Sequence, residues 1–357
     1  MTYLKNWQSQ TEKIPDSNQV LNSAGGYVWR IDDWKRLDRF LILGSCGGTY
    51  YVSEQKLTED NATAVKNCIA EDGVRVVNRV VEISEAGRAP KNDPALFVLA
   101  MCCSYGNVET KKVAFAALPL VARIGTHLFH FISYINTMRG WGRSVRTGVA
   151  GWYTSMTPEN LAWDAIKYQQ RDGWSHRDLL RLSHPKITDV EMQKVIRFIV
   201  KHEISDFPLL KAFSVVQETS DEEELIRYIQ DFHLPLEVIP TEKRTKAVWN
   251  TIFPNLGMTA LIRNLGNLSK QGVFDDEKNV DFVVNRLLDE WRLHQAKIHP
   301  IAILAALNTY SGGHGIRGKG EWTVNQRIVK ALDRAFYLSF GNVERTGKRV
   351  VLALDVS

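Results

Sequence analysis

Apolar residues recur at spacings of three and four along most of the chain, which is the period of helices with one buried face. The first such segment runs from Ile31 to Ile42, and further apolar segments follow at residues 93–104 and 111–124. The same pattern predicts later helices at residues 222–231, 244–253, 258–268, 279–294, 300–310 and 323–339. Since strands and helices do not alternate before about residue 345, the pattern predicts an all-α fold.

Capping signals mark several helix boundaries within this pattern. Thr157 is followed by Pro158, a favoured residue at the first helical position. Residues 175–178 and 188–191 have the spacing of capping boxes. Gly173 and Pro185 are suitable ends for the preceding helices. The middle of the chain is therefore predicted to consist of short, sharply bounded helices.

Many helices of this length joined by short loops suggest paired helices stacked as a solenoid. HEAT-like units run about 40–47 residues, so the helical part would hold roughly seven of them. The sequence shows no repeat by identity, so this prediction depends on the number of helices alone. An ordinary helical bundle is the alternative.

The two ends of the chain differ from this helical region. Residues 1–24 are polar and predict an extended N-terminal arm. Residues 350–354 form a continuous apolar run rich in β-branched residues, typical of a strand buried on both faces. We therefore expect an arm at 1–24, a helical-repeat module at 25–345, and at 346–357 the start of an α/β domain that is otherwise missing.

Composition indicates a globular protein of the cytoplasm. Hydrophobic residues make up 44% of the chain, and no run of eighteen apolar residues or secretory signal is found. The four cysteines, Cys46, Cys68, Cys102 and Cys103, form no CxxC pair. We expect them to be reduced and mostly buried thiols.

The net charge of +5 is distributed unevenly. Residues 139–186 hold eight Lys and Arg against four Asp and Glu, and residues 241–270 hold five against one. Residues 310–320 hold two basic residues and no acidic one. Such concentrations suit a polyanion such as nucleic acid, although solvated helix faces are the simpler alternative.

The densest candidate site lies between residues 167 and 184. Lys167 and Arg171 are four apart, so a helix would place them on one face, where a bound anion would relieve their repulsion. Arg177 and Arg181 have the same spacing, with His184 about one turn further on. Donors grouped in this way suit phosphate oxygens.

Aromatic residues accompany these donors. Trp174, Tyr168 and the histidines of this segment are candidates for stacking on unpaired bases. Packing of Trp174 between two helices is an equal alternative.

Two further basic segments are weaker candidates for RNA contact. Arg139 and Arg143, with Arg146, have helical spacing beside two glycines, which suggests a loop leading into a helix. The loop at 312–319, with Arg317 and Lys319, resembles the first part of a phosphate-binding P-loop. Gly320 stands where that motif needs Ser or Thr, and the preceding segment is helical, so we do not expect nucleotide hydrolysis.

Other candidate chemistry is weak. His127 and His130 would lie one helical turn apart, but no third metal ligand is evident. The carboxylates form no recognisable acid–base pair. We expect a binding protein without catalytic activity.

Ten short segments in a fixed order carry a family resemblance. They are Gly26–Trp29, Gly47–Tyr51, Glu54–Leu57, Thr126–Phe129, Trp141–Arg143, Gly173–His176, Asp178–His184, Leu261–Gly266, Ile298–Pro300 and Gly347–Arg349. Together they resemble the Ro autoantigen family, which carries the TROVE module. The resemblance covers nearly the whole chain.

The resemblance implies a ring of HEAT-like helical repeats with a C-terminal von Willebrand factor A domain. It implies that small noncoding Y-like RNA binds the outer ring surface, and that single-stranded 3′ ends of misfolded RNA enter the central hole. By motif, the family's Y RNA contacts fall on Lys167, Arg171 and His184. We expect a monomer without DNA specificity, with an exoribonuclease as a candidate partner.

The sequence departs from the family pattern at its end. Asp355 and Ser357 supply the first two ligands of the family's D-x-S-x-S metal motif, and the rest is absent. A divalent cation such as Mg²⁺ needs about six oxygen ligands, so we expect an incomplete site and no cofactor in this chain. The sequence leaves ring closure open. A helical scaffold for a nuclease or another protein is the alternative function.

Overall fold

The computed structural model describes residues 11–22, 25–45, 53–315, 320–343, 345 and 347. In the first half of this part of the chain, the helices are α1 (Asp33–Leu43), α2 (Glu54–Ala86), α3 (Asp93–Tyr105), α4 (Val108–Val121), α5 (Gly125–Met138), α6 (Arg143–Thr154), α7 (Pro158–Lys167), α8 (His176–Ser183) and α9 (Val190–Lys201). The second half holds α10 (Pro208–Glu218), α11 (Glu222–Phe232), α12 (Lys246–Ile252), α13 (Met258–Lys270), α14 (Glu277–Leu287), α15 (Glu290–Gln295), α16 (Pro300–Ser311) and α17 (Gln326–Leu338).

Short elements connect these helices. The 3-10 helices are η1 (Leu236–Val238), η2 (Thr241–Lys243), η3 (Phe253–Asn255), η4 (Val273–Asp275) and η5 (Ser339–Asn342). Strand β1 (Gln19–Leu21) pairs with β2 (Tyr27–Trp29), and β3 (Gln170–Arg171) pairs with β4 (Trp174–Ser175), both antiparallel. The first hairpin therefore joins residues on both sides of the expected boundary at residue 24.

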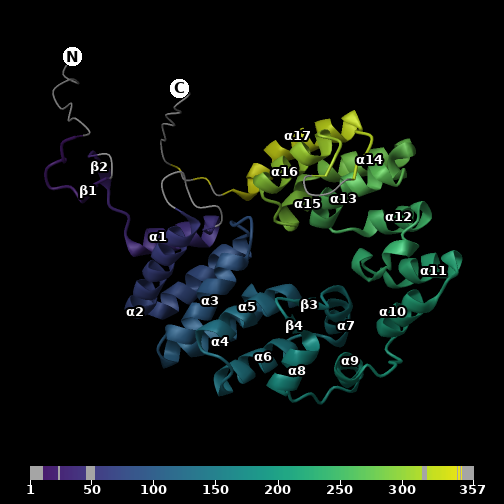
Figure 1. Cartoon of the computed structure of the whole chain (residues 1–357), viewed down its shortest axis with the longest axis horizontal. Helices are drawn as coiled ribbons and strands as arrows, with labels where there is room; N and C mark the ends of the chain where they lie inside the picture. Colours follow the sequence, from purple (N-terminus) through teal and green to yellow (C-terminus); the bar gives the residue numbers. More distant parts are fainter. Residues whose placement is uncertain are drawn as a thin grey trace.

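The helices follow one another around a central space (Figure 1). Along the lower arc in this view, α3, α5 and α7 lie on the inner side and α4, α6 and α8 on the outer side. Within each layer, α3 packs on α5, α4 on α6, and α6 on α8. This two-layer stacking confirms the predicted all-α fold of HEAT-like repeats curved into a ring. The predicted strand at 350–354 lies outside the described residues.

The two ends of the helical array contact each other. The Lys297 ammonium, on the loop after α15, donates to the backbone carbonyl of Glu85 near the end of α2. Gly87 lies against the same side chain, because a Cβ added there would stand 2.7 Å from the Lys297 Cβ. The described residues therefore close the ring by a direct contact, a point that the sequence left open.

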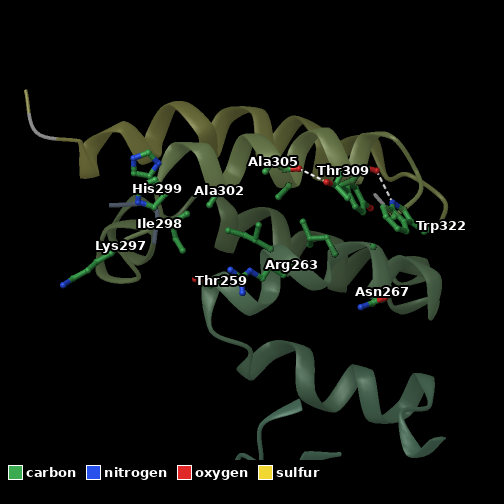
Figure 2. Close-up of a pocket in the computed structure, with 17 residues that line it drawn as sticks. Thr259, Arg263, Asn267, Lys297, Ile298, His299, Ala302, Ala305, Thr309 and Trp322 are labelled. Carbon is green, nitrogen blue, oxygen red and sulfur yellow. Dashed lines mark hydrogen bonds between the residues drawn. The ribbon is translucent and has the colours of Figure 1, made fainter. Parts of the chain in front are cut away.

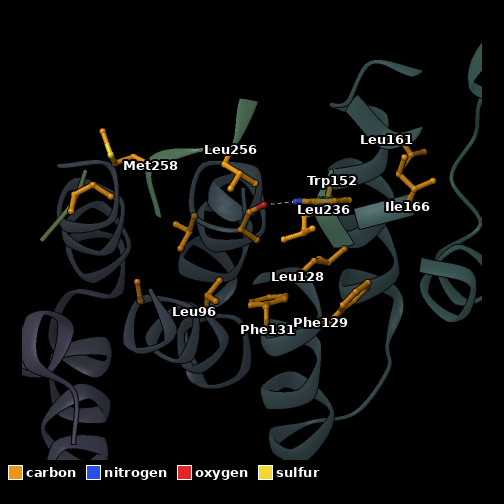
Figure 3. Close-up of a cluster of buried hydrophobic side chains, with 14 of the residues drawn as sticks. Leu96, Leu128, Phe129, Phe131, Trp152, Leu161, Ile166, Leu236, Leu256 and Met258 are labelled. Carbon is orange, nitrogen blue, oxygen red and sulfur yellow. Dashed lines mark hydrogen bonds between the residues drawn. The ribbon is translucent and has the colours of Figure 1, made fainter. Parts of the chain in front are cut away.

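A continuous apolar core runs between the layers. Helix α5 buries Leu128, Phe129, Phe131 and Ile132, which lie on more than one of its faces, because α3 and the β3–β4 hairpin both pack against it. In Figure 3, Leu128 lies between the indole of Trp152 of α6 and the rings of Phe129 and Phe131. Each large apolar side chain buried here contributes about 1.5–3 kcal/mol, so the core fixes where α5 to α8 present their polar ends.

The indole of Trp152 is also fixed by a hydrogen bond. Its Nε1 donates to the Ala122 carbonyl at 2.5 Å, at the end of α4. The bond satisfies a donor that would otherwise be buried without a partner, and it ties α6 to the preceding outer helix.

Two predicted helix starts were wrong, and Gly173, predicted to end a helix, lies instead in the turn between β3 and β4. The helix predicted at 279–294 is two helices, because Asp289 caps a new start by accepting from the Arg292 amide at 3.0 Å. The cap of α9 is Asp189, which accepts from the Met192 amide at 2.7 Å, and not Thr188 as predicted. In both places an aspartate within an apolar pattern starts the helix.

The cysteines of the described residues lie in the core. Cys68, Cys102 and Cys103 are free and buried, and burial raises the pKa of the Cys68 and Cys102 thiols to about 12. Such thiols are poor nucleophiles at neutral pH. No helix in the described ranges is long and apolar enough to cross a membrane.

Candidate nucleic-acid interface

Helix α7 presents Lys167 at its last residue. The helix starts at the predicted cap, where Thr157 accepts from the Asn160 amide at 3.2 Å. The Lys167 ammonium lies 4.4 Å from the centre of the Trp163 ring and 5.5 Å from that of Tyr168. Cation–π contacts orient the ammonium without neutralising it. Within the described residues no carboxylate pairs with it, so its charge is available to an anion.

Arg171 lies on the β3–β4 hairpin and not on a helix. Asp172 and Gly173, at the turn, both have positive φ, of 52° and 78°, as a type I′ turn requires. Arg171 is paired with Trp174 across the hairpin. The prediction that Lys167 and Arg171 share a helix face is therefore wrong, because α7 ends at Lys167 and the Asp-Gly turn reverses the chain.

The hairpin is held by two contacts that the sequence did not reveal, one to α5 and one to the loop between α5 and α6. His130 Nδ1 lies 2.5 Å from Asp172 Oδ2, and the ring of Trp174 lies 6.0 Å from that of Trp141. Trp174 is thus half-buried in β4 and packs against an indole on the loop between α5 and α6, which is neither of the two predicted roles, base stacking or packing between two helices. The contacts fix the hairpin from which exposed Arg171 projects.

Helix α8 carries the other predicted donors. Its start is the predicted capping box, since Ser175 and Asp178 each bond the other's backbone amide. Arg177 and Arg181 are exposed one turn apart on this helix, and His184 caps its end in the left-handed conformation with φ of 47°. None of these three side chains has an ion-pair partner in the part of the chain that the structure describes.

A buried polar network joins the start of α8 to the neighbouring helices. His176 is 2% exposed, with Nε2 3.1 Å from Asp164 Oδ2 and Nδ1 3.0 Å from the Tyr153 hydroxyl. Asp164 Oδ1 accepts from the Gly125 amide at 3.1 Å. His176 is therefore not available for stacking on bases, and its role is to join α5, α6, α7 and α8.

The second basic cluster lines a groove on the outer layer. Arg139 is the residue after α5 and donates to the Cys103 carbonyl at 2.6 Å, while Arg143 begins α6. Both line an open cavity of about 800 Å³ between α4 and α6, together with Lys112 and Phe115. Lys112 is a cation that the sequence analysis did not select, because only the fold brings α4 beside α6.

The remaining sequence candidates lie beyond the described residues. Arg317 and Lys319, and the metal candidates Asp355 and Ser357, all fall in ranges that the structure does not describe. In the described part of the chain, no group of three His, Cys, Asp or Glu could hold a metal ion. His130, a weak metal candidate, contacts Asp172 instead.

Comparison with known proteins places this geometry in a family. The sequence matches the TROVE domain over residues 20–232 and 236–312. RNA-binding protein RO60 of Deinococcus radiodurans is 41% identical over 98% of this chain and 67% of its own length. RNA-binding protein RO60 of Caenorhabditis elegans is 34% identical over 99% of this chain and 68% of its own length.

A solved structure has a similar fold. The crystal structure of the Deinococcus radiodurans RO (RSR) protein matches with a TM-score of 0.73 and 39% sequence identity, covering 88% of this chain and 65% of that one. This chain thus spans about two thirds of the length of these relatives. Sequence and fold agree that the chain belongs to the TROVE-domain family of Ro RNA-binding proteins.

Proposed function

We propose that this chain binds small structured Y-like RNA through a basic face formed by Lys167, Arg171 and His184, with Arg177 and Arg181 beside them. We also propose that it receives single-stranded 3′ ends of misfolded RNA in the central space of the ring. In this proposal the protein is a monomeric scaffold for RNA quality control and not an enzyme. The names of its relatives support RNA as the partner.

One observation carries the proposal. Five donors follow one another at the end of α7, on the β3–β4 hairpin and along α8, and among the described residues only Arg171 has a carboxylate within ion-pair distance. That contact, from Arg171 Nε to Asp172 Oδ1, is 3.9 Å long and leaves the guanidinium free to bind phosphate. Four of the five donors are exposed and Lys167 is half-buried, and such a group of unneutralised donors supports binding to a phosphate backbone.

The test is a filter-binding titration of a labelled Y-like stem–loop RNA at moderate salt. The variant carries Lys167→Ala, Arg171→Ala and His184→Asn, because Asn tolerates the left-handed backbone at that position. At about 1 kcal/mol for each of the three lost contacts, we expect affinity to fall on the order of 100-fold.

A control variant matches the change in charge and backbone. Lys330 and Arg334 are exposed and four apart on α17, and His233 caps α11 with φ of 48°, as His184 caps α8. The variant Lys330→Ala, Arg334→Ala, His233→Asn should bind like the parent. Equal affinities for all three proteins would show that the basic face is not the binding site.

A further inference from the structure

Three segments of the second half of the chain line one cavity that the basic face does not use. The cavity, of about 510 Å³, lies between α13 and α16 (Figure 2). Its walls include Ile262, Arg263 and Gly266 of α13, and Ile298 and His299 before α16. Gly315 and Trp322 line it from either side of the loop after α16. The first two of these segments are among those that carry the family resemblance, yet the proposed Y-like RNA site leaves them without a role.

The long walls of this groove are flat and apolar. Ala302, Ala305 and Ala306 of α16 face Ile262 and Gly266 of α13. The alanines have helical spacing along one side, so small side chains keep the space between the two helices open. We call the narrow space between these two walls the slot of the groove. Its shape suits a planar, weakly polar group.

One end of the groove carries a fixed aromatic ring. The rings of Trp322 and Tyr310 stack with centroids 6.3 Å apart and planes 16° apart, and Trp322 Nε1 donates to the Tyr310 carbonyl at 3.0 Å. The Tyr310 hydroxyl is bonded to Ser269 at 2.8 Å. A Cβ on Gly266 would stand 2.8 Å from the Trp322 ring, so glycine is needed for the ring to lie there.

The groove also carries positive charge without any negative charge. None of its lining residues is acidic, and Arg263 is exposed with no ion-pair partner in the described part of the chain. The Lys297 ammonium extends away from the slot towards the ring contact at Glu85 (Figure 2), which leaves Arg263 as the cation for a ligand.

His299 adds a hydrogen-bond donor to the lining. Its Nδ1 accepts from the Ile301 amide at 3.2 Å, so the neutral ring carries its proton on Nε2. Burial lowers the pKa of His299, which favours this neutral form at physiological pH.

We propose that this groove binds a nucleotide unit of a single RNA strand, with the base in the slot towards Trp322 and a phosphate on Arg263. The proposal rests on the single-strand binding proposed above and assigns to it a groove, its residues and the nucleotide unit that they hold. A phosphate needs the unpaired guanidinium, and every base has a π-face that suits an apolar slot ending in a fixed indole. An acidic peptide would satisfy Arg263 but would leave the flat slot without a planar group.

The test uses the full chain and a 5′-labelled hexaadenylate in fluorescence anisotropy. Arg263→Gln removes the charge, and Ala305→Leu fills the slot while keeping a strong helix former. Ala305→Ser is the matched control because it adds little volume. We expect each of the first two variants to lose at least about tenfold in affinity for hexaadenylate, equivalent to about 1.4 kcal/mol. Ala305→Ser should bind like the parent, and all should keep their affinity for the Y-like stem–loop.

The outcomes separate this inference from the proposed function. If Arg263→Gln and Ala305→Leu bind hexaadenylate like the parent, the groove is not the strand site. If the parent binds neither RNA, the proposed function itself fails. Retained binding of the stem–loop shows that a variant is folded. A variant that loses affinity for hexaadenylate alone therefore supports the groove as the binding site of the single strand.

Competition distinguishes the two sources of a nucleotide. If millimolar AMP displaces hexaadenylate from the parent, the slot also accepts a free nucleotide. If AMP has no effect while the two variants still lose hexaadenylate, the slot requires an RNA strand.

Discussion

At the scale of single residues, His127 has an environment that couples stability to pH. Its Nδ1 is buried without a hydrogen-bond partner within the described chain. Burial, with smaller contributions from Arg123 and His130, lowers its pKa to about 4. An unfolded histidine takes up its proton near pH 6.5, so between pH 6.5 and 4 the unfolded state binds more protons and the folded state loses stability.

We predict that His127→Gln makes the protein less sensitive to acid. Between pH 7.5 and pH 5, the free energy of unfolding of the parent should fall by about 2 kcal/mol more than that of the variant, because the variant lacks the group that titrates. Urea unfolding at the two pH values measures this difference. An equal fall in both proteins would mean that His127 is not buried in its neutral form.

Single residues also show which parts of the site could be predicted from the sequence. Arg177 and Arg181 were placed correctly, because their spacing and the capping box are local signals. Arg171 was assigned to the wrong element, because charge spacing was given more weight than the Asp-Gly turn signal. His176 was assigned to base stacking, because its partner Asp164 lies on another helix and no local pattern connects them.

At the scale of elements, α8 depends on its N-terminal cap. We predict that Ser175→Ala destabilises this helix by about 1 kcal/mol, because the hydroxyl no longer accepts from the Asp178 amide. Hydrogen exchange of the α8 amides should quicken roughly fivefold in this variant.

The control for the cap is Ser175→Thr, which keeps the accepting hydroxyl and should exchange like the parent. Unchanged exchange in Ser175→Ala would show that neighbouring helices, and not the cap, hold the start of α8.

Helices were easier to predict than their connections. Segments such as 222–231 and 300–310 were predicted within one or two residues, since their apolar period is regular and their ends carry caps. The split between α14 and α15 was missed because apolar residues continue across Leu288. The β3–β4 hairpin was missed because each strand is two residues long and shows no alternation.

At the scale of the whole molecule, the ring brings together groups that are distant in sequence. The contact of Lys297 with Glu85 and the groove between α13 and α16 both depend on closure, since Pro90 lines that groove from the opposite end of the array. Helix periodicity predicts that repeats stack, but the small rotation at each repeat decides whether the stack closes. Ring shape was therefore predicted by family resemblance and not by pattern.

The central claim is that the basic face binds RNA through its phosphates, and the salt dependence of binding tests it most directly. Each phosphate contact on a duplex contributes about 0.9 to the slope of log affinity against log salt. For the Y-like stem–loop, Lys167→Ala/Arg171→Ala should therefore show a slope smaller by about two than that of the parent. Identical slopes for the two proteins, or a parent whose affinity does not change with salt, would contradict the account.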